Sequence, residues 1–218
     1  MSRRLTGRFV VVAVVVSATA VVTSPGAWAT KGIHNFGGYS APVTASASAD
    51  ITVPSASSVS CSSAKSAIVD TWVALTRGQY AANAGLVIKC AVGSPLIYVA
   101  GAAGTLSFRF PVNGGDVISI AVSETPTATT VNAVDTTDGV SDAANFIGAT
   151  TAPTIVQFGA TSTTKSFPTF GPETFSSIVV DGTTLSSSSA TMRKLTRSHP
   201  PNVVPGPLSS GSFTLSET

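Results

Sequence analysis

The sequence has 218 residues, of which 43% are hydrophobic and only 10% are charged, and its formal net charge is +2. So low a charged share excludes a solvated disordered chain, a coiled coil and a nucleic-acid binder with a basic face. Two cysteines are too few for a disulfide-dense miniature scaffold or a four-thiolate zinc site. What remains is a Ser-, Thr-, Ala- and Val-rich globular chain of about one domain.

The first 29 residues have the three parts of a secretory signal peptide. Three arginines precede the apolar run 9–22, and Ala27-Trp28-Ala29 supplies a small-residue cleavage site. A membrane anchor is the alternative, but a helix over this run would span about 21 Å, short of a hydrocarbon core of about 30 Å. We expect cleavage after Ala29, no transmembrane segment in the mature chain 30–218, and a protein that is secreted or associated with the cell surface.

Removal of the signal changes the charge balance and the redox setting of the cysteines. The signal holds three arginines and no acid, so the mature chain has nine basic against ten acidic residues and a net charge of −1. This balance argues against a nucleic-acid partner. In an oxidising compartment Cys61 and Cys90 are expected to form one disulfide, the alternative being two buried free thiols.

The mature chain has the pattern of an all-β protein. No stretch keeps a helical apolar period for more than a few turns, whereas short β-branched runs recur, several with alternating apolar residues. Turn signals such as Asn113-Gly114-Gly115 and Asp181-Gly182 separate them. The expected strands are 43–53, 67–75, 85–92, 96–100, 105–110, 117–123, 129–135, 154–158, 174–180 and 211–216. Their number and spacing predict an antiparallel sandwich or barrel, without the helices of a parallel α/β sheet.

One segment departs from this pattern. Residues 192–208 carry the one basic cluster of the mature chain and several prolines, which exclude a central strand. We expect a solvated excursion before the final strand, within a single domain 30–218. Binding of an anionic surface polymer by this cluster is the alternative.

Motifs for common enzyme chemistry are missing. The two histidines, His34 and His199, lie in settings that do not suit a catalytic triad, and there is no phosphate-binding glycine loop and no zinc motif. Three carboxylates lie within the segment 135–142, which suggests a polar hairpin connection or, as the alternative, oxygen ligands for calcium. The sequence predicts no cofactor and no metal site.

The order of several short motifs resembles the secreted glutamic peptidases, the eqolisins, of which this chain would be a divergent, bacterial-type member. The blocks are Asn35-Phe36-Gly37-Gly38-Tyr39, Ala49-Asp50-Ile51-Thr52-Val53-Pro54, Asp70-Thr71-Trp72-Val73-Ala74-Leu75, Asn83-Ala84-Gly85-Leu86, Phe167-Pro168-Thr169-Phe170-Gly171 and Ser210-Gly211-Ser212-Phe213-Thr214-Leu215. The resemblance implies a lectin-like sandwich of two antiparallel sheets, of the concanavalin A-like or jelly-roll type. It also implies acid-pH proteolysis, with a glutamate as general base and a glutamine amide that steadies the nucleophile and the oxyanion.

The residues that would carry this chemistry are replaced. Asn83 matches the family's glutamine, and Pro153 matches its catalytic glutamate. Gln157 stands where a second glutamate is common. Because neither a proline nor an amide can accept the proton, the resemblance leaves open whether the chain is an enzyme.

Three hypotheses follow. The first is a catalytically degenerate, monomeric binding module for an extracellular peptide, protein or glycan. The second is an active acid endopeptidase whose carboxylate base has moved, to Asp70 or Glu124. The third is a carbohydrate-binding sandwich that presents Trp72 or Tyr98, with Gln157, in a groove.

Overall fold

The computed structural model describes residues 36–61, 68–76, 80–91, 94–162, 168–195 and 202–218. The predicted signal peptide, its cleavage site and both histidines lie outside these residues. Over the described ranges, we find no helix with the length and apolar character needed to cross a membrane.

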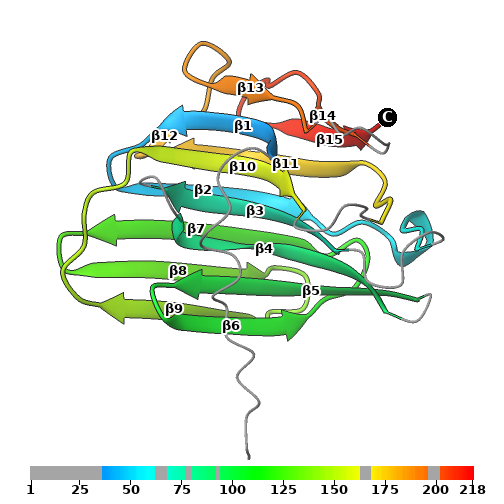
Figure 1. Ribbon diagram of the computed structural model, residues 1–218, viewed down its shortest axis with the longest axis horizontal. Helices are drawn as coiled ribbons and strands as arrows, with labels where there is room; N and C mark the ends of the chain where they lie inside the picture. The colour runs from blue at the N-terminus through cyan, green and yellow to red at the C-terminus, as the bar shows by residue number, and fades with distance from the viewer. Residues whose placement is uncertain (1–35, 62–67, 77–79, 92–93, 163–167, 196–201) are drawn as a thin grey trace, which may run out of the picture.

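Two antiparallel sheets stack face to face and form a β-sandwich (Figure 1). Sheet A has the strand order β13-β1-β10-β3-β4-β5-β6, and sheet B the order β14-β15-β11-β2-β7-β8-β9, with β12 paired to β11. The strands of sheet A are β1 (Phe36–Pro42), β3 (Ile68–Thr76), β4 (Tyr80–Ala91), β5 (Ser94–Ala103), β6 (Leu106–Pro111), β10 (Ile155–Thr161) and β13 (Thr191–Arg193). Sheet B contains β2 (Ser46–Thr52), β7 (Val117–Thr125), β8 (Ala128–Asp135), β9 (Ser141–Ile147), β11 (Glu173–Val180), β14 (Val203–Pro205) and β15 (Phe213–Glu217), and β12 is Thr183–Thr184. A short 3-10 turn, η2 (Ala56–Ser58), follows β2.

The all-β prediction is confirmed, and each expected run overlaps a strand. The run 43–53 begins too early, because Thr44 and Ala45 form a turn between β1 and β2. Strands β1 and β9 and the short strands β12, β13 and β14 were not predicted. In β1, Gly37 and Gly38 weaken the strand signal, and β9 is the exposed edge of sheet B, where few apolar side chains are needed.

The core lies between the sheets and is built from every second residue of the strands. Val69, Val73 and Leu75 of β3 point inward and face Ile118 and Ile120 of β7 in the same buried cluster. Because side chains alternate along a strand, the even-numbered residues of β3 point to the opposite side, the outer face of sheet A. The inward register of β3 therefore decides which side chains that face presents.

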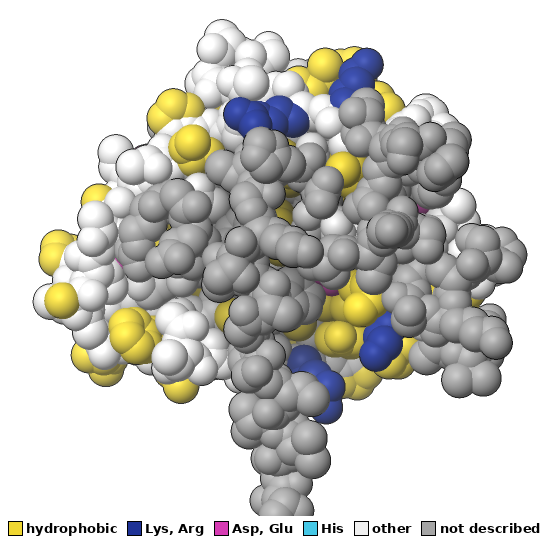
Figure 2. Space-filling view, in the orientation of Figure 1, with side chains coloured by type: hydrophobic (Ala, Val, Ile, Leu, Met, Phe, Trp, Pro, Cys, Tyr) yellow, Lys and Arg dark blue, Asp and Glu magenta, His cyan; other side chains and the backbone are white. Residues whose placement is uncertain are grey.

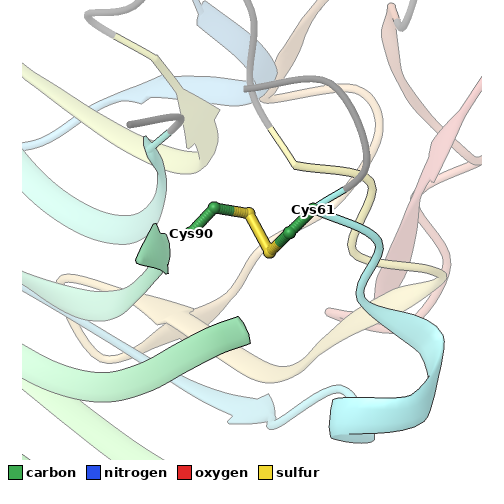
Figure 3. Close-up of a disulfide and its surroundings, with 2 residues drawn as sticks. All are labelled: Cys61 and Cys90. Atoms are coloured by element: carbon green, nitrogen blue, oxygen red, sulfur yellow. A yellow bond between two sulfur atoms is a disulfide. The ribbon is translucent and has the colours of Figure 1, made fainter. Parts of the chain in front are cut away.

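The predicted disulfide is present. Cys61, after the 3-10 turn, is bonded to Cys90 on β4, with Cα atoms 5.5 Å apart (Figure 3). It ties the connection between β2 and β3 to the strand that neighbours β3.

The described part of the segment 192–208 forms short strands at the sheet edges. β13 pairs with β1 at the edge of sheet A, and β14 pairs with β15 at the edge of sheet B. Leu195 and Val203 join across these edges through paired backbone hydrogen bonds, and both side chains are buried. The prolines are thus compatible with strands at an edge, because there not every backbone N–H has to donate to a neighbouring strand.

Candidate functional site

The outer face of sheet A carries a line of six paired residues, four of which have side chains that can form hydrogen bonds. Directly paired residues on neighbouring strands share a face, so the strand register fixes this line. We call it the amide row, and it consists of Ser40, Gln157, Ala74, Asn83, Ala102 and Ser107.

Gln157 and Asn83 flank Ala74 in this row. Each is paired with Ala74, on β10 and β4 respectively, so their Cα atoms are about 10 Å apart across two strand spacings. Gln157 is 1% exposed and its Oε1 has no hydrogen-bond partner, whereas Asn83 is 9% exposed. Ala74 between them carries only a methyl group, so no polar side chain in this row separates the two amides.

Pro153 lies elsewhere. It is buried just before β10, and Ile155 is the first residue of that strand. Of the two residues that match glutamate positions of the eqolisins, Gln157 and not Pro153 thus lies in the same row as Asn83.

A second row runs parallel to the amide row, two residues further along each strand. We call it the arginine row, and it consists of Arg193, Gly38, Gly159, Trp72, Gly85, Ala100 and Arg109. Arg193 and Arg109 are exposed and lie on the two edge strands of sheet A, while Trp72 at the centre is 4% exposed.

The glycines of the arginine row permit close packing. A Cβ on Gly38 or Gly159 would lie 2.1–2.2 Å from a backbone oxygen of the partner strand and 2.9 Å from the Phe36 ring. The ring of Phe36 therefore lies over both glycines on this face.

Asp70 is the one acidic residue on a strand of sheet A. It is 2% exposed, its Oδ1 has no hydrogen-bond partner, and desolvation raises its pKa well above the ordinary value. The pKa of Tyr98 is also raised, by desolvation first and then by Asp70, while Arg109 acts to lower it. Asp70 and Tyr98 thus interact electrostatically on the side of the arginine row away from the amides, and Arg109 of that row interacts with Tyr98.

Asp70 lies far from the two carboxamides of the amide row, Gln157 and Asn83. Four residues separate it from Ala74 on β3, which corresponds to about 13 Å. Glu124, the other candidate base, belongs to β7 of sheet B and is 4% exposed. Neither carboxylate lies within hydrogen-bond reach of Asn83.

The two candidate groove aromatics differ in exposure. Trp72 is buried, and Tyr98 is half-buried on β5. Tyr98 and Gln157 lie on the same outer face but in different rows and on strands separated by β3 and β4.

Three aspartates form a cluster of carboxylates in the turns that border β7 and β8 of sheet B. Ligand oxygens of Asp116, Asp135 and Asp138 lie within 4.8 Å of one another, whereas Asp142 of the predicted set is not among them. Asp135 accepts hydrogen bonds from the amides of Thr137 and Asp138, and Asp116 accepts one from the amide of Asn113. These bonds stabilise the two turns, as expected for a polar hairpin connection.

Sequence reasoning missed Glu173. This residue is fully buried between the sheets, and burial raises its pKa to about 8, with a hydrogen bond from Thr71 acting to lower it. It directly precedes the predicted strand 174–180, where a charged residue has the pattern of a surface acid, and only the inward register of Phe175 could have indicated its burial.

Comparison with known proteins gives a likeness of fold. No family model and no curated protein matches the sequence. Among solved structures, scytalido-glutamic peptidase with a peptide-based transition-state analogue superposes with a TM-score of 0.66 at 17% identity, covering 85% of this chain and 99% of that chain. SCP-B, a member of the eqolisin family solved with the tripeptide Ala-Ile-His, gives 0.62 at 16% identity with the same coverage. Aspergilloglutamic peptidase from Aspergillus niger gives 0.53 at 18% identity, over 70% of this chain and 99% of that chain. The chain thus has the sandwich fold of the glutamic peptidases.

Proposed function

We propose that this chain is a secreted binding protein that holds an extended polypeptide on the outer face of sheet A and does not cleave it. The observation that carries the proposal is the amide row. Two carboxamides, Gln157 and Asn83, flank Ala74, and no carboxylate stands in that row.

The chemistry of the row suits a peptide backbone better than hydrolysis. An amide both donates and accepts hydrogen bonds, which matches the alternating N–H and C=O groups of an extended chain. General base catalysis of water attack needs a group that can take a proton, and an amide cannot. Two of the solved neighbours carry a peptide or a peptide-based analogue, which supports the class of ligand.

The unpartnered Oε1 of Gln157 also favours a ligand that donates. A buried acceptor without a partner costs about 1–3 kcal/mol, and a peptide N–H directed at it would recover that energy. The carbohydrate-binding alternative loses one of its two aromatic candidates, because Trp72 is 4% exposed, whereas Tyr98 is half-buried.

Extracellular location is part of this proposal. A predicted signal peptide, a formed disulfide and a fold shared with glutamic peptidases support it. We further propose that the protein acts as a monomer.

The test combines binding and cleavage. The mature chain is mixed with fluorescently labelled neutral nonapeptides, and anisotropy is recorded for the wild type, for Gln157→Ala with Asn83→Ala, and for the control Asn132→Ala. Asn132 is an exposed amide on the outer face of sheet B. We expect the double variant to weaken binding about tenfold or more and the control to match the wild type.

The same preparation is incubated with a denatured protein at pH 3–5, and products are followed by mass spectrometry. No cleavage is expected from the wild type. Cleavage that disappears in Asp70→Asn would contradict the proposal and establish the active peptidase with a relocated base.

A further inference from the structure

Charge is divided between the two sheets. All ten Asp and Glu residues of the sequence are described, and nine of them lie on sheet B or in the turns that border its strands. Asp70, buried on β3, is the exception. The four Lys and Arg residues within the described ranges are Lys89, Arg109, Arg193 and Lys194, and they lie on strands of sheet A or directly after β13.

Three of these cations belong to the outer face of sheet A. Arg193 and Arg109 end the arginine row, and Lys89 lies on β4 four residues beyond Gly85, which also belongs to that row. None of the four cations forms an ion pair with another described residue. Figure 2 shows this face, with Lys and Arg in blue at its upper and lower parts and Asp and Glu visible only as small magenta areas.

The one acid on this face, Asp70, is outnumbered by the three cations. Asp70 is removed from solvent with one oxygen unpartnered, and desolvation favours its protonated, neutral form. The face therefore has a positive potential, although the chain as a whole carries more acidic than basic residues once its signal is removed.

We propose that the ligand held on the outer face of sheet A is an acidic polypeptide segment, with carboxylates near both of its ends that pair with Arg193 and Arg109. This inference rests on the proposed function, since it names the chemistry of the peptide bound there. The two arginines are six strand spacings apart, about 29 Å, which an extended peptide covers with about nine residues. Arginine pairs with a carboxylate through two parallel hydrogen bonds, so each end of such a peptide gains a specific anchor.

The amide row runs beside the arginine row and can receive the backbone of the same peptide. Two residues of strand rise separate the rows, about 7 Å, which is within reach of a backbone whose side chains extend toward the arginines. An acidic glycan shares the carboxylates but lacks the alternating N–H and C=O groups of a peptide backbone, which the carboxamides of Gln157 and Asn83 match.

The experiment uses nonapeptides that differ in charge alone. One has Glu at positions 1, 2, 8 and 9, its neutral analogue has Gln at these positions, and a hexamer of galacturonic acid represents acidic glycans. Affinities for the mature chain are measured by anisotropy and calorimetry at two salt concentrations. The variants are Arg109→Gln with Arg193→Gln and, as a control for net charge, Asn132→Asp with Asn145→Asp on the outer face of sheet B.

We expect the acidic peptide to bind at least about tenfold more tightly than the neutral one at low salt, and this preference to fall as salt rises. The arginine variant should remove the preference and leave the neutral peptide's affinity unchanged, whereas the control should keep the preference. Equal affinities for the two peptides would overturn this inference and leave the proposed function intact. Failure of both peptides to bind would overturn this inference and the proposed function alike. Arginine-dependent binding of the galacturonate hexamer without binding of the acidic peptide would assign the face to an acidic glycan.

Discussion

Thr71 and Glu173 connect the two sheets inside the core, through a 2.6 Å hydrogen bond from Oγ1 of Thr71 on β3 to Oε1 of Glu173 on β11. The second oxygen of Glu173 has no hydrogen-bond partner, and the side chain is fully buried. Burial raises the pKa of Glu173 to about 8, while the bond from Thr71 acts to lower it. The residue is therefore protonated throughout the acid range.

This relationship predicts that the fold is most stable at acid pH. Because the folded-state pKa of Glu173 lies above the ordinary value of 4.5, its favourable contribution is complete below about pH 4.5 and is lost as the pH rises to about 8. The loss amounts to at most about 1.4 kcal/mol per pH unit for one group. Desolvation also raises the pKa of Glu217 to about 7, which adds in the same direction. Urea unfolding at pH 4, 6 and 8 should show a steady fall in the free energy of unfolding.

Glu173→Gln is the variant that isolates this effect. It keeps an acceptor for Thr71 but does not titrate, so the decline between pH 4.5 and 8 should be shallower than in the wild type. Thr71→Val removes the donor instead, and it should destabilise the fold by about 1–3 kcal/mol even at pH 4. An unchanged pH slope in Glu173→Gln would show that Glu173 does not ionise over this range.

Asp181 predicts a pH effect of opposite sign. Its Oδ2 accepts from the amide and hydroxyl of Thr44 at 2.7 and 2.8 Å, and its Oδ1 accepts from the amides of Ala45 and Ser46 at 2.9 Å. Desolvation acts to raise the pKa of Asp181, but these bonds outweigh it and lower the pKa overall. The stability that this carboxylate contributes is present above about pH 4 and is lost as the pH falls through the lowered pKa.

Asp181→Asn tests this turn while tolerating its positive φ of 48°. Because the turn is exposed, we expect a loss of only about 1 kcal/mol at pH 7, and a smaller difference from the wild type at pH 3. Asp142→Asn, an exposed acid that accepts one bond from the next amide, is the matched control. A loss of the same size in both variants would assign the effect to net charge.

The disulfide is expected to contribute through the unfolded state. Cys61 and Cys90 are 29 residues apart, and closure of such a loop is worth about 3–4 kcal/mol in the chain-entropy model. Cys61→Ser with Cys90→Ser should lower the free energy of unfolding by about this amount. Dithiothreitol should destabilise the wild type similarly and leave the double variant unchanged, and a wild type insensitive to the reductant would argue against this contribution.

The paired glycines under Phe36 give the last prediction. A Cβ on Gly159 would lie 2.2 Å from the carbonyl oxygen of Gly37, at a φ of +157°. Gly159→Ala should therefore cost about 3 kcal/mol or more, measured by thermal unfolding. Gly206→Ala is the control, because its nearest neighbour would be 3.3 Å away, and it should change stability by less than about 1 kcal/mol. Similar losses in both would contradict the close approach of β1 and β10.

The sequence predicted the sandwich because alternation and turn residues are local signals. Leu106 to Phe110 and the run from Val117 already show a buried and an exposed face without knowledge of their neighbours. It could not show that Gln157 and Asn83 share a row, since that depends on the pairing of β10, β3 and β4. The separation of charge between the sheets was hidden for the same reason, because which sheet a charged residue joins depends on the strand pairing and not on its place in the sequence.

That topology also bears on how the chain reaches its native state. Strand β1 has β10 and β13 as its neighbours, and β2 lies between β7 and β11, so residues from the beginning of the domain are held by residues from its end. Pairings this distant in sequence are slow to form and cannot be completed on a partial chain. The domain should therefore refold slowly, over milliseconds to seconds, and a chain that ends before β10 should lack the strand that joins β1 to β3.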